Sequence, residues 1–185
     1  MPKIEIVAYR AEWTGEYCAI AERLRAAAGP QVLALHHIGS TSVPGLAAKD
    51  IVDIQITVAA LEPPLPLEAA GFRLGPHRTD HCPPGLTLPP IELEKRFFKQ
   101  APREANIHVR VRGRFNQRYP LLWRDYMRSH PSAAHAYEEI KKQLARRFPD
   151  DVEAYYDIKN PVFDIVMAGA EDWAAATSWQ EPPSD

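Results

Sequence analysis

The segment 38–53 holds the residue types with the clearest chemical meaning in this sequence. A predicted strand ends there at Gly39, and three hydroxyl residues follow it: Ser40, Thr41 and Ser42. Glycine lets a backbone approach a ligand closely, and backbone amides at the start of a helix favour phosphate. The separation of Gly39 from Gly45, with no Gly-Lys-Ser/Thr after it, excludes a P-loop. The segment is therefore a candidate anion site, or a capped turn whose hydroxyl groups satisfy free helix amides.

Asp53 is the second chemical candidate, because it lies inside the apolar run 51–54. Burying an unpaired carboxylate in such a strand is expensive, so Asp53 needs a partner. That partner could be a cation of the protein such as Lys49. It could also be a divalent cation that arrives with a phosphorylated substrate, since magnesium is often held by few carboxylates plus substrate phosphates. The residues alone leave both alternatives open.

A strand that ends in Gly-Ser, followed about a dozen residues later by an Asp in a hydrophobic strand, resembles the signature of the nucleotidyltransferase superfamily. The longer string 37–49, His-Ile-Gly-Ser-Thr-Ser-Val-Pro-Gly-Leu-Ala-Ala-Lys, resembles the GrpB family within that superfamily. The likeness spans most of the chain. Its further motifs are Trp13 in an early helix, the strand 106–109, the string 124–131, Tyr137 with Lys141, and Tyr155 with Lys159.

The resemblance implies a triphosphate at the Gly39–Ser40 turn and Mg²⁺ on strand carboxylates. An acceptor hydroxyl then attacks the α-phosphorus in line and pyrophosphate leaves, a reaction that depends mainly on positioning and charge neutralisation. Asp53 matches the first strand carboxylate. Gln55, on the same strand face, stands where a second carboxylate is usual, so the expected metal positions are Asp53 and Gln55. Gln55 cannot supply charge. A two-metal site would therefore need ligands from substrate or from Glu92 or Glu94. Without them the site would bind at most one Mg²⁺.

His108 lies in a later predicted strand, roughly where the superfamily has a third acidic residue or its substitute. We expect it to act as a general base toward the acceptor, because an unperturbed histidine pKa of about 6.5 is close to working pH. The alternative is a histidine that only hydrogen-bonds a neighbour in an amphipathic strand. The expected catalytic residues are thus Asp53 and His108.

Basic residues near the turn are candidate triphosphate contacts, since ammonium groups bind phosphate oxygens as point charges. Of Lys95 and Arg96 only one can face the cleft, because side chains alternate along a strand. Lys141 and Lys159 each follow a tyrosine by four residues, which could also be an ordinary solvated helix face. The expected nucleotide-binding residues are Gly39, Ser40, Thr41, Ser42, Lys49, Arg96, Lys141 and Lys159.

The elements that must position these residues indicate an α+β fold. Apolar residues recur at helical spacing over 13–28, until Gly29-Pro30 ends the pattern. Two strands, 32–38 and 51–58, are predicted to be central neighbours, buried on both faces. Shorter strand candidates are 4–8, 72–74, 91–98 and 106–112, and we expect a mixed, nucleotidyltransferase-like sheet of about five strands flanked by helices.

After Arg114 the patterns are helical only. One helix is predicted around 121–127, one from Pro131 to Phe148, a short one from Asp150 or Asp151 to Ile158, and a last one from Asn160-Pro161. We expect an α/β core over 1–114, a helical subdomain packed on it over 115–178, and a frayed tail over 179–185.

Composition excludes several classes of protein. Lys and Arg number 22 against 24 Asp and Glu, a formal net charge of −2, with no block of like charges to favour nucleic-acid binding. No apolar run approaches the ~18 residues of a membrane span, and the first residues lack the apolar core of a signal peptide, so we expect no membrane partner and a cytoplasmic location. Cys18 and Cys82 have no zinc or disulfide spacing.

Three functions are consistent with these residues. The first is an enzyme, a nucleotidyltransferase that uses Mg²⁺ to transfer a nucleotidyl group from a nucleoside triphosphate, with ATP as the expected donor, to a small-molecule acceptor. The second is a non-catalytic nucleotide- or metabolite-binding module of the same fold. The third is a role linked to coenzyme A metabolism, which the resemblance suggests because GrpB-like domains also occur fused to dephospho-coenzyme A kinase.

Overall fold

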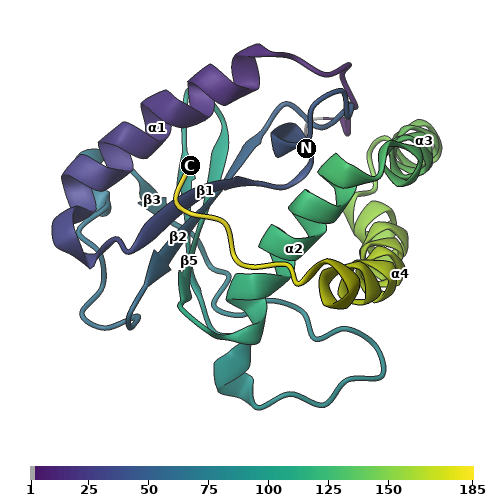
Figure 1. The fold of residues 1–185 in the computed structure, drawn as a ribbon. Coiled ribbons are helices and arrows are strands. Elements are labelled where there is room, and N and C mark those ends of the chain that lie inside the picture. The colour runs from purple at the N-terminus through teal and green to yellow at the C-terminus, as the bar shows by residue number, and fades with distance from the viewer. Residues whose placement is uncertain (1–2) are drawn as a thin grey trace.

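The computed structural model describes residues 3–185 as a five-stranded mixed sheet with helices on both faces (Figure 1). The strand order is β1-β2-β5-β4-β3. β2 pairs parallel with β5, and the other pairs are antiparallel. The strands are β1 (Ala34–Ile38), β2 (Val52–Val58), β3 (Arg73–Leu74), β4 (Arg96–Gln100) and β5 (Ala105–Val111). The predicted α+β class with a mixed sheet and C-terminal helices is confirmed.

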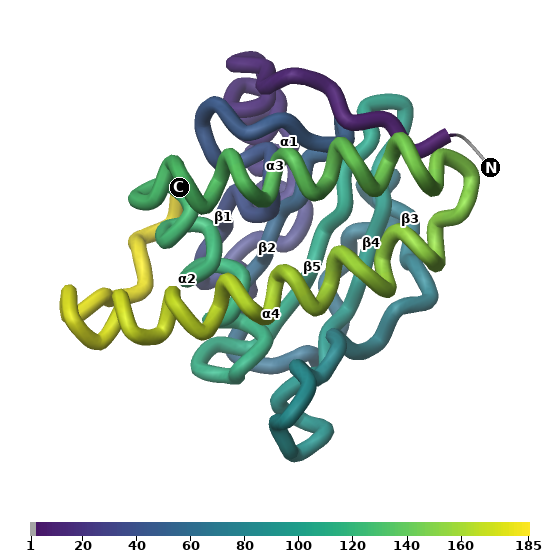
Figure 2. Tube along the Cα trace, turned by 90° about the vertical axis from the view of Figure 1, so that its right-hand side faces the viewer, coloured from purple at the N-terminus to yellow at the C-terminus, as the bar shows by residue number. Residues whose placement is uncertain are grey.

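Four helices cover the two faces of this sheet. Helix α1 (Glu12–Ala28) lies on one face, and α2 (Phe115–Ser129), α3 (Pro131–Arg147) and α4 (Val152–Thr177) lie on the other. Figure 2 shows α3 and α4 crossing in front of the strands. None of the helices within residues 3–185 combines the length and apolar character that a bilayer span requires.

The two faces of β2 differ in chemistry, and this difference creates the site. Val52, Ile54 and Ile56 are fully buried against α1, in a core that includes Trp13 and Leu24. The alternate side chains of β2 are polar and face α2–α4. Burial on both faces was predicted for β2, but its second face is a buried polar surface. The helices α2–α4 form a separate apolar core with the segment after the Gly39 turn, so a polar layer lies between sheet and helices.

Several boundaries differ from the sequence prediction. Residues 4–8 form no strand, only a bridge between Val7 and Ala48. The strand expected over 91–98 begins at Arg96, because residues 90–92 form a 3-10 turn that starts at a proline. β1 neighbours β2 as predicted, but it lies at the edge of the sheet. The two last predicted helices are one, and α4 continues through Pro161. Packing of α4 against α2 and α3 outweighs the ~3 kcal/mol that an internal proline costs.

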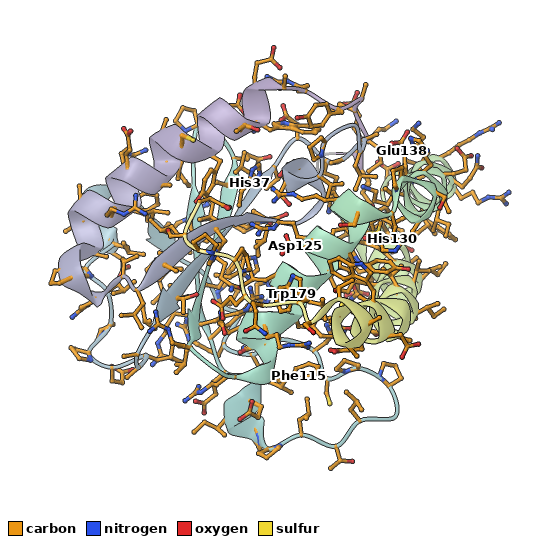
Figure 3. All side chains as sticks on the ribbon, viewed as in Figure 1. His37, Phe115, Asp125, His130, Glu138 and Trp179 are labelled. Atoms are coloured by element: carbon orange, nitrogen blue, oxygen red, sulfur yellow. The ribbon has the colours of Figure 1, made fainter. Side chains whose placement is uncertain are left out.

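The tail 179–185, expected to fray, instead lies along β1 (Figure 1). The Asp185 amide donates to the Leu35 carbonyl at 3.0 Å, and the Asp185 carboxylate accepts from the His37 amide at 2.8 Å and from Arg124 at 2.9 Å. Trp179 donates to Asp125 on α2 at 3.0 Å (Figure 3). The tail therefore covers the free hydrogen-bonding edge of β1, which explains why it is ordered.

Candidate functional site

A pocket of about 520 Å³ lies between the polar face of the sheet and the three C-terminal helices. Its floor is formed by β2, β4 and β5, its wall by α2, α3 and α4, and one end by the turn after β1. The loop 77–81 closes another side. This volume is within the range of small-molecule sites in proteins. The lining carries five cationic side chains, Lys49, Lys95, Arg110, Lys141 and Lys159, but only two carboxylates, Asp53 and Asp80.

Gly39 shapes the turn at the end of β1. Its backbone has φ +70° and ψ −172°, a region that is essentially restricted to glycine. A Cβ atom at this position would lie 2.6 Å from Oδ2 of Asp53. Glycine was expected here because a ligand could approach the backbone. The structure shows a different reason, since the space beside Gly39 is occupied by the Asp53 carboxylate.

The three hydroxyl residues after Gly39 form a single 3-10 turn and have different partners. The Ser40 hydroxyl lies in the pocket and accepts a hydrogen bond from Lys141 at 2.9 Å. Thr41 Oγ1 is 2.9 Å from Nε2 of His37, which is buried and stacked on Tyr17. Ser42 is outside the pocket lining and donates back to the Gly39 carbonyl at 2.6 Å. Ser40 is therefore the hydroxyl best placed for a ligand, and Ser42 has a structural role.

Asp53 lies at the start of β2, with 30% of its side chain exposed to the pocket. Burial disfavours its charged form, but the nearby His108 ring and a 2.9 Å hydrogen bond from Asn106 outweigh burial and hold the Asp53 pKa below its ordinary value. Asp53 forms no ion pair with Lys49, whose ammonium instead donates to Tyr156 at 2.5 Å. One carboxylate oxygen, Oδ2, accepts no hydrogen bond from residues 3–185. A magnesium ion fits this donor set as one carboxylate ligand.

Three lysines from different elements converge on the wall opposite the sheet. Lys49 and Lys159 lie over the ring of Tyr156, at 4.4 Å and 5.4 Å, and Lys141 lies over Tyr137. None of the three forms an ion pair with a carboxylate within the described part of the chain. Burial and mutual repulsion lower the pKa of Lys141 to about 7 and that of Lys159 to about 8. Such a cluster of unneutralised ammonium groups favours a polyanion.

The helix α3 is also tied directly to the turn. Lys141 donates to the Ala47 carbonyl at 2.5 Å, and Glu138 accepts from the Ala47 amide at 2.8 Å. Figure 3 labels Glu138 on α3. The lysine and the glutamate thus hold both backbone polar groups of Ala47, its carbonyl and its amide. The position of the turn in the pocket depends on α3.

The sheet side of the pocket contains a network that is nearly fully paired. Asp80 accepts from Lys95 at 2.5 Å, from Arg110 at 2.9 and 3.0 Å, and from Asn116 at 3.1 Å. Burial alone would raise the Asp80 pKa, but the two cations hold it far below its usual range. Arg110 also donates to Oε1 of Gln55 at 2.7 Å, and Gln55 donates to the Gln117 carbonyl. Both ends of the Gln55 amide are therefore occupied.

His108 contacts this network through one ring nitrogen. Its Nδ1 is 3.4 Å from the Lys95 ammonium and 3.3 Å from the Arg110 guanidinium. Lysine and arginine can only donate, so Nδ1 accepts and the ring proton lies on Nε2, 3.9 Å from Asp53. Burial and Arg110 lower the His108 pKa to about 4. The ring is a neutral donor near Asp53, which differs from the expected general base with an ordinary pKa.

Several predicted site residues lie elsewhere. Arg96 is outside the pocket lining and pairs with Glu62, whereas Lys95 faces the pocket. Glu92 accepts from the Phe115 amide at the start of α2, Glu94 pairs with Arg114, and neither lines the pocket. Gln55 does not line the pocket, and residues 3–185 contain no group of three or more His, Cys, Asp or Glu side chains that could hold a metal. The metal position at Gln55 stays a prediction, and in the structure the Gln55 amide has two protein partners, Arg110 and the Gln117 carbonyl.

The sequence prediction missed Asp80 and Arg110 as residues of the site. Asp80 lies in a loop without regular structure, between residues that gave no periodic pattern. Arg110 is two positions after His108 and therefore on the same face of β5, which was the one available signal. Asn106, named only as part of the strand motif, shares that face and binds Asp53.

Comparison with known proteins finds relatives that match most of this chain. The family model described as GrpB protein matches residues 3–168. A protein of Mycolicibacterium paratuberculosis named dephospho-CoA kinase is 36% identical in an alignment of 188 residues that covers 91% of this chain and 46% of that protein. UPF0157 protein YqkA of Bacillus subtilis is 33% identical in an alignment of 174 residues that covers 92% of this chain and 48% of that one. The chain thus spans about half the length of these two relatives.

A solved structure has the same fold as this chain. The crystal structure of the conserved protein GrpB from Enterococcus faecalis superposes with a TM-score of 0.72 and 25% sequence identity. The match covers 91% of this chain and 99% of that one. The architecture described above is therefore shared over nearly the whole of both chains.

Proposed function

This chain belongs to the GrpB family, and we propose that its pocket binds a nucleoside triphosphate with Mg²⁺ and transfers the nucleotidyl group to a small-molecule acceptor. ATP is the proposed donor. The observation that carries this proposal is the convergence of three unpaired lysines and the Ser40 turn beside Asp53. A triphosphate supplies the several negative charges that such a cluster lacks.

In this proposal the triphosphate lies between the Ser40 turn and Lys49, Lys141 and Lys159. The ammonium groups neutralise its oxygens and orient the chain of phosphates. Asp53 would hold Mg²⁺, which when bound supplies further charge neutralisation at the phosphates. The acceptor hydroxyl attacks the α-phosphorus, and the bond from that phosphorus to the oxygen bridging to the β-phosphate breaks.

His108 contributes a hydrogen-bond donor to this arrangement. Because its Nδ1 contacts two cations, the ring does not take up a proton readily. The hydroxyl proton therefore goes to solvent, which a reaction dominated by positioning and electrostatics allows. The Nε2–H group can donate to an oxygen of the bound substrate beside Asp53.

The test is incubation of the protein with α-labelled nucleoside triphosphates, Mg²⁺ and a metabolite extract. We expect transfer of label to a small molecule, and loss of transfer in Asp53→Asn. Asp157→Asn is the matched control, because Asp157 is exposed on α4 and outside the pocket lining. Absence of triphosphate binding to the folded protein would overturn the proposal.

A second candidate is a nucleotide-binding module without catalysis. The occupied Gln55 amide favours it, because the superfamily pattern has a carboxylate there and this chain has none. Tight triphosphate binding without labelled product, across the same extract, would support this candidate over the enzyme.

The names of the relatives suggest which acceptors to include first. The Mycolicibacterium protein is named dephospho-CoA kinase, and this chain matches about half of it. Dephospho-coenzyme A and coenzyme A should therefore be tested individually as acceptors and as ligands. Displacement of a bound triphosphate by either compound would support a role in coenzyme A metabolism.

A further inference from the structure

The paired network on the sheet side supports an inference that rests on the proposed function. We propose that the pocket accepts a single divalent cation, at Asp53, and that Lys95 and Arg110 directly supply the positive charge that a second metal ion provides in two-metal sites. In those sites the two ions lie about 3.5–4 Å apart and stabilise the attacking and leaving oxygens.

The available oxygen ligands support one ion. Magnesium requires oxygen donors, usually carboxylates together with substrate phosphates. Of the two carboxylates that line the pocket, Asp53 has an oxygen free of hydrogen bonds from the described residues. Asp80 accepts four hydrogen bonds from Lys95, Arg110 and Asn116. A metal at Asp80 would have to displace two buried cations.

The superfamily pattern has its second carboxylate at position 55. In this chain the residue there is Gln55, and its side chain is hydrogen-bonded to the guanidinium of Arg110. Arg110 Nη1 is 2.7 Å from Gln55 Oε1, and the other end of the amide donates to the Gln117 carbonyl at 2.8 Å. The Gln55 side chain is completely buried. No rotation of the amide offers an oxygen to a metal without breaking both hydrogen bonds.

The charge of the network also excludes a second ion. Lys95 and Arg110 share one carboxylate, so the network has one positive charge in excess, close to Asp53. This excess charge would repel a second divalent ion, and no further carboxylate of residues 3–185 lines the pocket to offset the repulsion. Lys95 has three N–H groups and Arg110 five, and each keeps at least one without a protein partner in the described structure. These two donors remain for substrate oxygens.

Counting bound ions tests the inference. The protein is dialysed to equilibrium with Mn²⁺ and a nonhydrolysable α,β-methylene analogue of ATP, and protein-bound nucleotide and manganese are quantified against a protein-free chamber. We expect one Mn²⁺ per bound analogue and no spin coupling between manganese ions. Two coupled ions would overturn the inference and leave the proposed function standing. Failure of the analogue to bind would overturn the proposed function itself. Binding of the analogue without manganese would overturn the proposal that one divalent cation binds at Asp53.

Two variants test whether Arg110 is the group that excludes the second ion. In Gln55→Glu the new carboxylate pairs with Arg110, so we expect the count to remain at one. In Gln55→Glu with Arg110→Gln the carboxylate is released, and we expect a count of two. Gln55→Glu with Arg96→Gln is the control and should keep one, since Arg96 pairs with Glu62 outside the pocket lining. Two ions in Gln55→Glu alone, or one in the folded double variant, would overturn the role given to Arg110. The count for the unaltered protein stands if a variant fails to fold.

Discussion

On the sheet side of the pocket Lys95 and Arg110 share the Asp80 carboxylate, whereas on the helix side Lys49, Lys141 and Lys159 form no ion pair within residues 3–185. Both sides bury cations, so burial does not distinguish them. The difference is whether the protein supplies the counter-charge. A network that has its own carboxylate holds the fold and the orientation of His108, while ammonium groups without a carboxylate leave their whole charge available to a ligand.

The sheet side should therefore contribute more to stability, and the helix side should contribute more to ligand affinity. Removing the Asp80 charge from the sheet side should destabilise the protein, because Lys95 and Arg110 are left buried without a carboxylate. Removing a charge from the unpaired side should weaken ligand binding and leave stability unchanged or higher, because a desolvated cation disappears.

The largest effect is expected from Asp80→Asn. This change leaves Lys95 and Arg110 buried without a carboxylate, and we expect the free energy of unfolding to fall by about 3–5 kcal/mol. Urea denaturation followed by circular dichroism measures it. Glu62→Gln removes the partner of Arg96 where Glu62 is 65% exposed, and should cost less than about 1 kcal/mol. Equal losses in the two variants would show that the sheet-side network is not the stabilising side.

Gly39→Ala should affect both stability and binding. The backbone conformation at Gly39 costs about 1–3 kcal/mol for a residue with a side chain, and the new Cβ would displace the Asp53 carboxylate. We expect triphosphate affinity in Mg²⁺ to fall at least tenfold by calorimetry. Gly45→Ala is the matched control, with φ +81° and no atom within 4 Å of its Cβ. If Gly45→Ala weakened binding equally, backbone strain alone would explain the loss.

Lys159→Met should weaken triphosphate binding without destabilising the protein. The methionine keeps contact with Tyr156 and Phe163 but removes a charge that has no partner carboxylate in the described structure. We expect an affinity loss of about tenfold, which is about 1.4 kcal/mol, and an unchanged or higher melting temperature. Lys142→Met, on the exposed face of α3 where Lys142 pairs with Glu138, should leave affinity unchanged. A drop in melting temperature with normal affinity would show that Lys159 contributes to stability and not to binding, which contradicts the prediction.

The smallest effect is a dependence of binding on pH. The pKa values of Lys141 and Lys159 lie at about 7 and about 8, below that of an ordinary lysine, because both are buried among other ammonium groups. A triphosphate binds their protonated forms and raises both pKa values, so binding near pH 8 takes up protons and affinity falls several-fold as pH rises from 7 to 9. Calorimetry in two buffers of different ionisation enthalpy measures the uptake. Lys159→Met should reduce it, and proton release on binding would contradict the prediction.

Local patterns in the sequence predicted most of the helices and strands, and the part of the site between Gly39 and Asp53. Helix α1, the strands β1, β2 and β5, and the turn from Gly39 to Asp53 follow from periodicity and from residue types within short windows. These features depend on neighbours along the chain, which a sequence displays directly. The identification of Lys49, Lys141 and Lys159 beside that turn rested on resemblance, since the lysines lie on three separate segments.

The tertiary structure alone decided the partners of the polar residues. Strand alternation allowed either Lys95 or Arg96 to face the pocket, and the register of β4 on β5 selects Lys95. The roles of Gln55 and His108 depend on Arg110 and on Asp80 in a distant irregular loop. The energy of a buried charge is set by which groups surround it in space. Sequence therefore determined where the turn and its aspartate would be, and only packing decided that the neighbouring histidine is a neutral donor.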